Sequence, residues 1–211
     1  IFGPALAATL VGPLGTGWLF IINGISYVFM LYGLVGLRKT EMFTPEPRPA
    51  GGTPVRDGIR FVRTHQRLYP LFVVFAVVST FAFNYSVVLP KLSDVQWGQE
   101  NGYPILLTIV SVGSIFGALS TARFRVIGVR WYGTLVSINA LSCIALGFAP
   151  NFLVACLVAL PLGFGGTGLV ASMTGISQQK TSPEMRSRML ALQSVAFLGS
   201  TPIGGPITGW I

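Results

Sequence analysis

The side chains that could do chemistry in this sequence are uncharged amides and hydroxyls set inside long apolar stretches. Asn84 is the best example, because an amide in the middle of an apolar helix costs free energy unless it meets a polar partner or a wet cavity. Tyr85 and Thr80 lie near it along the chain, and Asn23 and Asn139 sit in other apolar stretches. These five residues are candidates for lining a substrate pathway, although each could instead form a hydrogen bond that only holds helices together.

The residues that an enzyme or a metal centre would need do not come together in the sequence. His65 is the only histidine, and we interpret it as an exposed loop residue because no carboxylate or cysteine is paired with it. Cys143 and Cys156 fall inside apolar runs, so they are interpreted as small buried hydrophobic residues. Nucleotide-binding signatures such as a P-loop are absent from the sequence. We therefore expect no enzymatic activity, no metal site and no cofactor.

Composition indicates the solvent that surrounds these residues. Of the 211 residues, 52% are hydrophobic and 9% are charged, whereas an average soluble domain has about 25% charged residues. Because about 20 apolar residues suffice to cross a bilayer core, the chain offers several candidate spans. There are seven: 1 to 15, 17 to 37, 68 to 90, 103 to 122, 131 to 149, 152 to 177 and 189 to 211. The sequence predicts an all-α membrane protein with about seven transmembrane segments, and we expect the first and last to be truncated.

The basic residues of the chain alternate between successive loops. Thirteen of the 14 Lys and Arg fall on one predicted side, in 38 to 67, 123 to 130 and 180 to 188, whereas only Lys91 falls on the other. By the positive-inside rule the first side is cytoplasmic. The net charge of +8 therefore indicates a membrane and not a nucleic acid as the partner. Buried helices of a large soluble protein would show no such alternation.

Residues 38 to 66 form the only long loop and begin with a Pro- and Gly-rich stretch that is typical of a flexible linker. After Pro54 we expect an amphipathic helix that lies on the cytoplasmic interface with its arginines toward anionic headgroups, or else a solvated connector. Thr181 to Glu184 has the pattern of a capping box, which predicts the start of the last helix.

Small residues recur at helical spacing in the predicted spans. Gly113 and Gly117 form a face that lets helices approach closely. The two ends of the chain also resemble each other, with Gly3 and Pro4 near one end and Pro202 near the other. The offset of Pro202 from Pro4 corresponds to one repeat of six helices, and parallel six-helix halves are one way in which transporters are built.

Four segments together resemble the major facilitator superfamily, and within it the bacterial transmembrane secretion effectors, which include the enterobactin exporter. The segments are Gly3-Pro4-Ala5-Leu6-Ala7 and the stretches 57 to 63, 83 to 90 and 183 to 188. The resemblance runs over essentially the whole chain and implies helices five to eleven of a twelve-helix bundle. Residues 1–37 would then be the last two helices of the N-terminal half, 38–66 the cytoplasmic linker, and 67–211 the C-terminal half.

The same resemblance implies a function and further candidate residues. In this superfamily the first helix of each half borders the pathway, which favours a position of Asn84 at the central cavity. A cytoplasmic motif of the family survives here as Gly117, Leu119 and Arg123 without its acidic residue. The gating and cytoplasmic-loop candidates are Arg123, Arg125, Glu184, Arg186 and Arg188.

We therefore expect a secondary active transporter in the bacterial cytoplasmic membrane that exports a small amphipathic compound by alternating access. Its expected partners are a small-molecule substrate and the lipid bilayer. No ionisable group occurs in the middle of any span, so the sequence shows no buried carboxylate for proton coupling. Coupled protons stay open as a partner, because such a group could lie in helices of the bundle outside this chain. An importer of the same fold, a channel and a polytopic scaffold are the alternatives.

Overall fold

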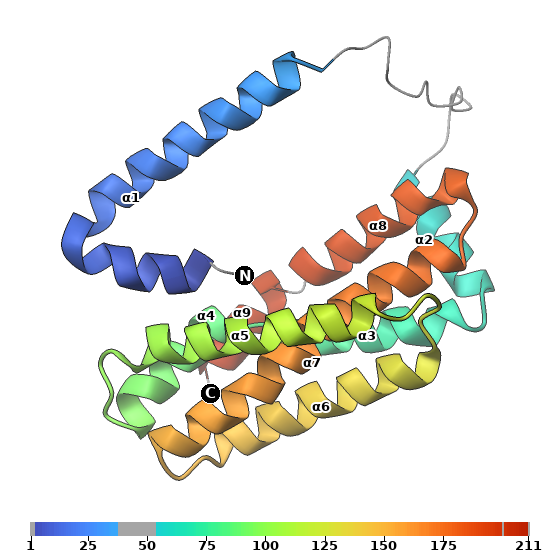
Figure 1. Ribbon diagram of the computed structural model, residues 1–211. Coiled ribbons are helices and arrows are strands. Elements are labelled where there is room, and N and C mark those ends of the chain that lie inside the picture. Colours follow the sequence, from blue (N-terminus) through green and yellow to red (C-terminus); the bar gives the residue numbers. More distant parts are fainter. Residues whose placement is uncertain (1–2, 38–53, 200, 211) are drawn as a thin grey trace. The chain divides into compact units, whose positions relative to one another are not determined.

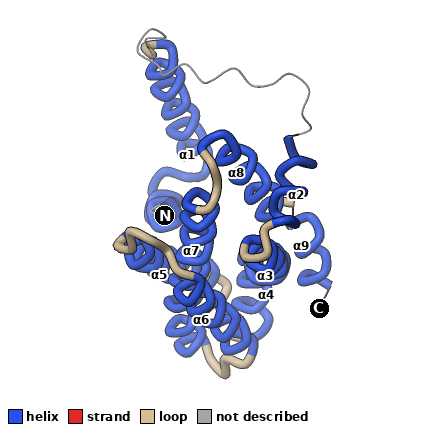
Figure 2. The backbone as a smooth tube through the Cα atoms, turned by 90° about the vertical axis from the view of Figure 1, so that its right-hand side faces the viewer, coloured by secondary structure: helices blue, strands red, loops and turns tan. Residues whose placement is uncertain are grey.

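The computed structural model describes residues 3–37, 54–199 and 201–210. Every regular element among these residues is a helix, as Figure 1 and Figure 2 show. The described residues form two units, 3–37 and 54–210, which are presented separately. The predicted linker stretch 38 to 53 lies outside the described residues.

The first unit is the helix α1, Gly3–Val35, which is interrupted at Gly15. Gly15 has φ 74° and ψ 162°, a conformation that only glycine adopts without strain. The interruption separates the two apolar stretches that the sequence predicts as spans. Residues Gly17–Val35 alone are long and apolar enough to cross a membrane.

The second unit is a bundle of helices joined by short turns. Its elements are α2 (Pro54–Thr64), α3 (Leu68–Ala82), α4 (Tyr85–Lys91), the π-helix η2 (Leu92–Gln96), α5 (Gly102–Ala122), α6 (Val129–Gly147), α7 (Phe152–Gln179), α8 (Pro183–Leu198) and α9 (Thr201–Trp210). Within this unit α7 packs most extensively against α5 and α6. Figure 1 shows these three long helices running side by side.

Five helical stretches among the described residues are long and apolar enough to span a membrane. They are Gly17–Val35, Leu68–Gln96, Gly102–Ala122, Val129–Gly147 and Phe152–Gln179. The chain is therefore a multi-pass, all-α membrane protein. The predicted span 189 to 211 is divided between α8 and α9, and the predicted span 68 to 90 continues to Gln96 with a break inside it.

The turns of the second unit gather at two opposite ends. At one end, which we call the basic end, the α2–α3 turn meets the end of α7, and Gln179 of α7 is hydrogen-bonded to the α5–α6 loop. At the opposite end, the indole nitrogen of Trp97 and the amide nitrogen of Gln96 both donate to the carbonyl of Ala149, at 3.0 and 3.2 Å. Successive turns of this unit therefore alternate between its two ends.

The helix α2 buries part of its apolar face against protein, while Ile59 on that face is 40% exposed. Val62 is 5% exposed, and Gly58 lies against Arg188 and Leu192 of α8. Arg56, Arg60 and Arg63 are exposed. The arginine face of this predicted amphipathic helix therefore stays available to solvent or headgroups, while its other face packs on α8.

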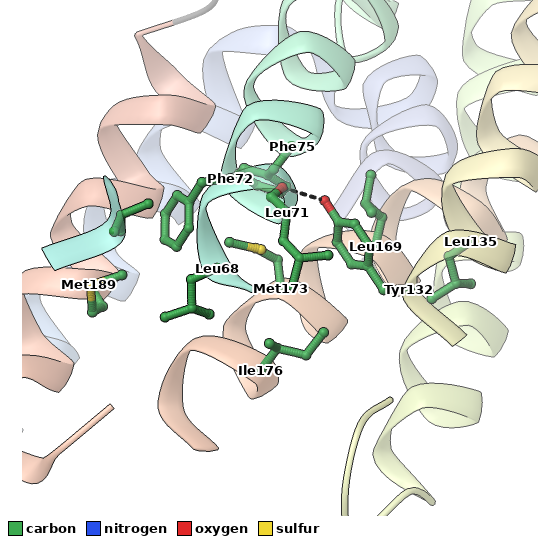
Figure 3. Close-up of a cluster of buried hydrophobic side chains, with 11 residues drawn as sticks. Leu68, Leu71, Phe72, Phe75, Tyr132, Leu135, Leu169, Met173, Ile176 and Met189 are labelled. Carbon is green, nitrogen blue, oxygen red and sulfur yellow. Dashed lines mark hydrogen bonds between the residues drawn. The ribbon is translucent and has the colours of Figure 1, made fainter. Parts of the chain in front are cut away.

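A buried apolar cluster near the basic end joins α3, α6 and α7. Figure 3 shows its side chains, among them Leu71, Phe75 and Met173. In this cluster the hydroxyl of Tyr132 on α6 donates to the carbonyl oxygen of Leu71 on α3 at 2.9 Å. A second cluster, which includes Leu89 and Leu162, lies toward the opposite end.

Candidate functional site

The span Leu68–Gln96 is a broken helix, and Asn84 lies at the break. Phe83 and Asn84 leave the helical conformation, with ψ values of 14° and 40°. The side-chain nitrogen of Asn84 donates to the carbonyl of Thr80 at 2.6 Å. Asparagine side chains compete for backbone hydrogen bonds in this way, which explains why the helix ends here although its composition is apolar.

Asn84 is buried, with 3% of its surface exposed, and α9 covers it. A Cβ atom built on Gly204 of α9 would lie within contact of the Thr80 carbonyl and of the Asn84 amide. The Asn84 amide thus has a polar partner, the Thr80 carbonyl, in its own span. Position 204 must be glycine, because a larger residue would collide with both groups. The sequence predicted a polar residue inside a continuous helix, and the interruption is the part that it did not predict.

Tyr85 and Asn139 come together on the far side of the break. The side-chain nitrogen of Asn139 on α6 donates to the Tyr85 hydroxyl at 3.4 Å and to the Leu162 carbonyl of α7 at 3.3 Å. Asn139 is fully buried, and its Oδ1 has no hydrogen-bond partner among the described residues. Two helices distant in sequence therefore bring an amide and a phenol together at mid-depth.

Two glycines of α7 make room for this polar pair. A Cβ atom on Gly165 would lie 2.8 Å from the Asn139 backbone nitrogen. A Cβ atom on Gly166 would lie 3.0 Å from the Tyr85 hydroxyl and 3.3 Å from the Asn139 side-chain nitrogen. Side chains at these positions would displace the polar groups, so the glycines are part of the site.

Aromatic rings border the same region. The rings of Phe83 and Tyr85 lie 5.9 Å apart, and Phe83 also packs edge-on to Phe197 of α8 at 5.1 Å. Phe197 in turn stacks with Phe75 of α3 at 6.3 Å. The site therefore combines a few hydrogen-bonding groups with apolar surface, which is the usual composition of a small-molecule site.

The two other pathway candidates are not part of this polar pair. The hydroxyl of Thr80 donates to the Ala76 carbonyl of its own helix at 2.8 Å, so it is satisfied locally. Asn23 belongs to α1 and is described only within that unit, where its side chain is exposed and its carbonyl accepts from Ser26.

A family model described as transmembrane secretion effector matches residues 1–211. The chain belongs to this family. It is therefore a membrane transporter of the major facilitator type, with a role in efflux. No curated protein and no solved structure shows a significant match to the chain.

The cytoplasmic-loop candidates of this secretion effector lie at the basic end. Arg123 lies over the ring of Phe124, with 5.4 Å from its guanidinium carbon to the ring centroid. Arg125 and Arg186 are exposed, and a guanidinium nitrogen of Arg188 lies 3.7 Å from the sulfur of Met185. The side chain of Glu184 lies outside the described residues.

Gln179 is a residue at this end that the sequence analysis missed. Its Oε1 accepts from the Ile127 backbone at 3.2 Å, and its Nε2 donates to the Arg125 carbonyl at 3.4 Å. The amide thus holds the α5–α6 loop, which carries Arg123 and Arg125, to the end of α7. Its place two residues beyond the predicted span 152 to 177 was the only signal in the sequence.

The start of α8 differs from the predicted capping box. Ser182 occupies the N-cap position with no side-chain cap bond, and Pro183 follows at the first helical position. Thr181 is buried, and its hydroxyl has no partner among the described residues. Because Pro183 already lacks a backbone N–H and favours the first helical position, this helix needs less capping there.

The glycines predicted to serve helix packing lie between α5 and α7. A Cβ atom on Gly113 would fall against the Leu160 carbonyl, and one on Gly117 against the Phe164 carbonyl. Gly163 of α7 contacts the Val110 carbonyl in the same manner. Pro202 is exposed, while the contact of α9 with α3 is made by Gly204. Gly3 and Pro4 lie in the first turn of α1, and nothing further is described of them.

Proposed function

We propose that this chain forms part of a secondary active transporter that exports a small amphipathic compound across a bacterial cytoplasmic membrane by alternating access. Residues 1–37 would contribute the last two helices of the N-terminal half, 38–66 the cytoplasmic linker, and 67–211 the C-terminal half. The substrate is moved by exposing one central site to the two sides of the membrane in turn.

The observation that carries this proposal is the broken span with buried polar groups beside the break. Transporter sites lie near the bilayer midplane, where discontinuous helices free polar groups for the substrate. Here Asn84 lies at the break of the 29-residue span, and Tyr85 and Asn139 meet next to it. Asn139 stands at the eleventh residue of the 19-residue α6, so both helices place their amide at mid-depth.

The chemistry of these residues favours an amphipathic substrate. The amides and the phenol supply hydrogen bonds, and Phe83 and Phe197 supply apolar surface, but none of these five side chains carries a formal charge. A substrate with a few polar atoms and a large apolar part matches such a site. The unpartnered Oδ1 of Asn139 would accept a hydrogen bond from the substrate once the helices move apart.

The proposal is tested by dye efflux from intact cells that express the full-length carrier. Ethidium and the neutral dye N-phenylnaphthylamine serve as amphipathic probes. We expect Asn139→Leu to slow efflux of at least one dye by about tenfold, the effect of losing about 1.4 kcal/mol of interaction. Carrier abundance in the membrane is measured in the same cells.

Gln193→Leu is the matched control, because Gln193 is also a buried amide, whose Nε2 bonds Thr174 on α7 at 2.8 Å. This variant should lower thermal stability while the folded carrier keeps its efflux rate. Efflux from wild-type cells no faster than from cells with an empty vector would contradict an exporter of amphipathic compounds. Dye entry into the wild-type cells that is faster than entry into the empty-vector cells would favour an importer.

A further inference from the structure

A pocket opens at the basic end between the α2–α3 turn and the end of α7. Its volume is about 510 Å³, within the range of small-ligand sites. The described residues that line it are Thr64, His65, Gln66, Arg67, Leu68, Gln179 and Lys180. It contains the single histidine of the chain, His65, whose ring lies beside that of Phe61 with 4.2 Å between the ring centroids.

The pocket gathers basic and hydrogen-bonding side chains without a carboxylate. Arg67 and Lys180 bring two full positive charges, and none of the seven described lining residues is acidic. His65 and Gln66 add hydrogen-bonding side chains, whereas the Thr64 hydroxyl donates to carbonyls of its own helix and the Gln179 amide is bonded to the α5–α6 loop. Arginine presents a planar fork of donors that fits a phosphate, and lysine adds a compact charge. The preferred ligand of such a set is a phosphate group.

The helix ends at the pocket do not cancel this charge. The helix α3 begins at Leu68, while α2 ends at Thr64 and α7 ends at Gln179. Each helix end carries only about half an elementary charge, positive at the start and negative at the end. One start and two ends therefore leave a small negative contribution, which the charges of Arg67 and Lys180 exceed. The pocket stays electropositive.

The position of the pocket indicates where the phosphate comes from. Leu68 is the first residue of one candidate span and Gln179 is the last residue of another, so the pocket lies where the bilayer core gives way to headgroups. Tyr69 beside it is 47% exposed, as is common for tyrosine at this depth. Basic pockets between helices on the cytoplasmic side suit anionic lipid headgroups.

We propose that this pocket binds the phosphate of an anionic phospholipid headgroup from the cytoplasmic leaflet. The headgroup bridges Arg67 before α3 and Lys180 after α7, two helices that are in contact and contribute Leu68 and Ile176 to the buried cluster of Figure 3. Through Gln179, which also holds the α5–α6 loop, the lipid ties three segments of the basic end together. Anionic lipid thereby stabilises this end of the bundle.

The test is the thermal unfolding midpoint of the purified chain in neutral detergent, followed by tryptophan fluorescence. Phosphatidylglycerol, phosphatidylcholine and inorganic phosphate are added separately. We expect phosphatidylglycerol to raise the midpoint by several degrees, and the other two additions to change it little. The double variant Arg67→Gln/Lys180→Gln should lose at least half of that rise.

The variant Arg130→Gln/Arg186→Gln is the matched control, because it removes two exposed positive charges outside the pocket and outside the arginine face of α2. It should keep the full rise. An equal loss in both variants would show a diffuse charge effect and overturn the site. An equal rise with inorganic phosphate would overturn the lipid assignment and give the pocket to a soluble phosphate. Should the double variant fail to fold, the single variants Arg67→Gln and Lys180→Gln are measured instead. Each should lose part of the rise in the unfolding midpoint.

Discussion

At the scale of single residues, two buried tyrosines have different partners. Tyr132 donates to a backbone carbonyl of α3 and so joins two helices inside an apolar cluster. The Tyr85 hydroxyl accepts a hydrogen bond from Asn139 beside the helix break, and the Oδ1 atom of Asn139 has no hydrogen-bond partner among the described residues. The first bond is a structural bond, and the second lies in the proposed substrate pathway.

This contrast predicts opposite outcomes for the same substitution. Tyr132→Phe removes a buried hydrogen bond that links α6 to α3, while the Leu71 carbonyl keeps its bond within α3, so we expect a loss of about 0.5 to 1.5 kcal/mol of stability with efflux by the folded protein unchanged. Tyr85→Phe keeps the ring but removes the hydroxyl, so we expect slower efflux or an altered dye preference with a smaller loss of stability. Thermal unfolding and dye efflux measure both variants. The opposite pattern would exclude Tyr85 from the pathway.

The polar residues of the site could be predicted from the sequence only in part. Asn84, Tyr85 and Asn139 stand out because polar side chains are costly in apolar helices. Their bonds could not be predicted, since the partner of Asn139 lies 54 positions away and depends on how α4 and α6 pack. Gln179 was missed because it lies at the end of a span, where a polar residue costs little and attracts no notice.

At the scale of the elements, the most extensive contact in the bundle is between α5 and α7. Gly113 and Gly117 face carbonyl groups of α7, and Gly163 faces a carbonyl of α5. Without a strong hydrophobic driving force between helices in lipid, such close packing supplies much of the association. The glycine face therefore fixes the position of α7, from which Gly165 and Gly166 shape the site.

Adding one methyl group at this contact should cost stability. Gly113→Ala places a Cβ atom against the Leu160 carbonyl, and backbone must move to admit it, so we expect a loss of about 1 to 3 kcal/mol. Gly133→Ala in α6 is the control, because nothing lies within 4 Å of the added atom. There we expect a gain of up to about 1 kcal/mol from helix propensity. Equal effects on the thermal unfolding midpoint would refute the close contact.

The elements themselves were largely predictable, because long apolar runs must form helices in lipid. The exceptions have local causes. Asn84 breaks the predicted span 68 to 90 by bonding the Thr80 carbonyl, and α8 ends at Leu198 before a separate α9. Hydropathy is an average over many residues, so it does not detect such interruptions.

At the scale of the whole molecule, charge and packing divide the second unit, 54–210, into the same two ends. The α2–α3 turn, the α5–α6 loop with the start of α6, and the end of α7 lie at the basic end. Together they carry Arg67, Arg123, Arg125, Arg130 and Lys180. Trp97 and Ala149 meet at the opposite end. An exporter whose site opens to the cytoplasm, and a pocket for lipid of the cytoplasmic leaflet, both require the basic end to face inward.

Thiol labelling in intact cells tests this orientation most directly. Cys143 and Cys156 are first replaced by Ala, and single cysteines are then placed at exposed positions, Gly128 and Ser187 at the basic end and Glu100 and Pro150 at the opposite end. An impermeant maleimide should label the cysteines at 100 and 150 in intact cells, and those at 128 and 187 only after permeabilisation. Labelling at 128 or 187 in intact cells would contradict the account.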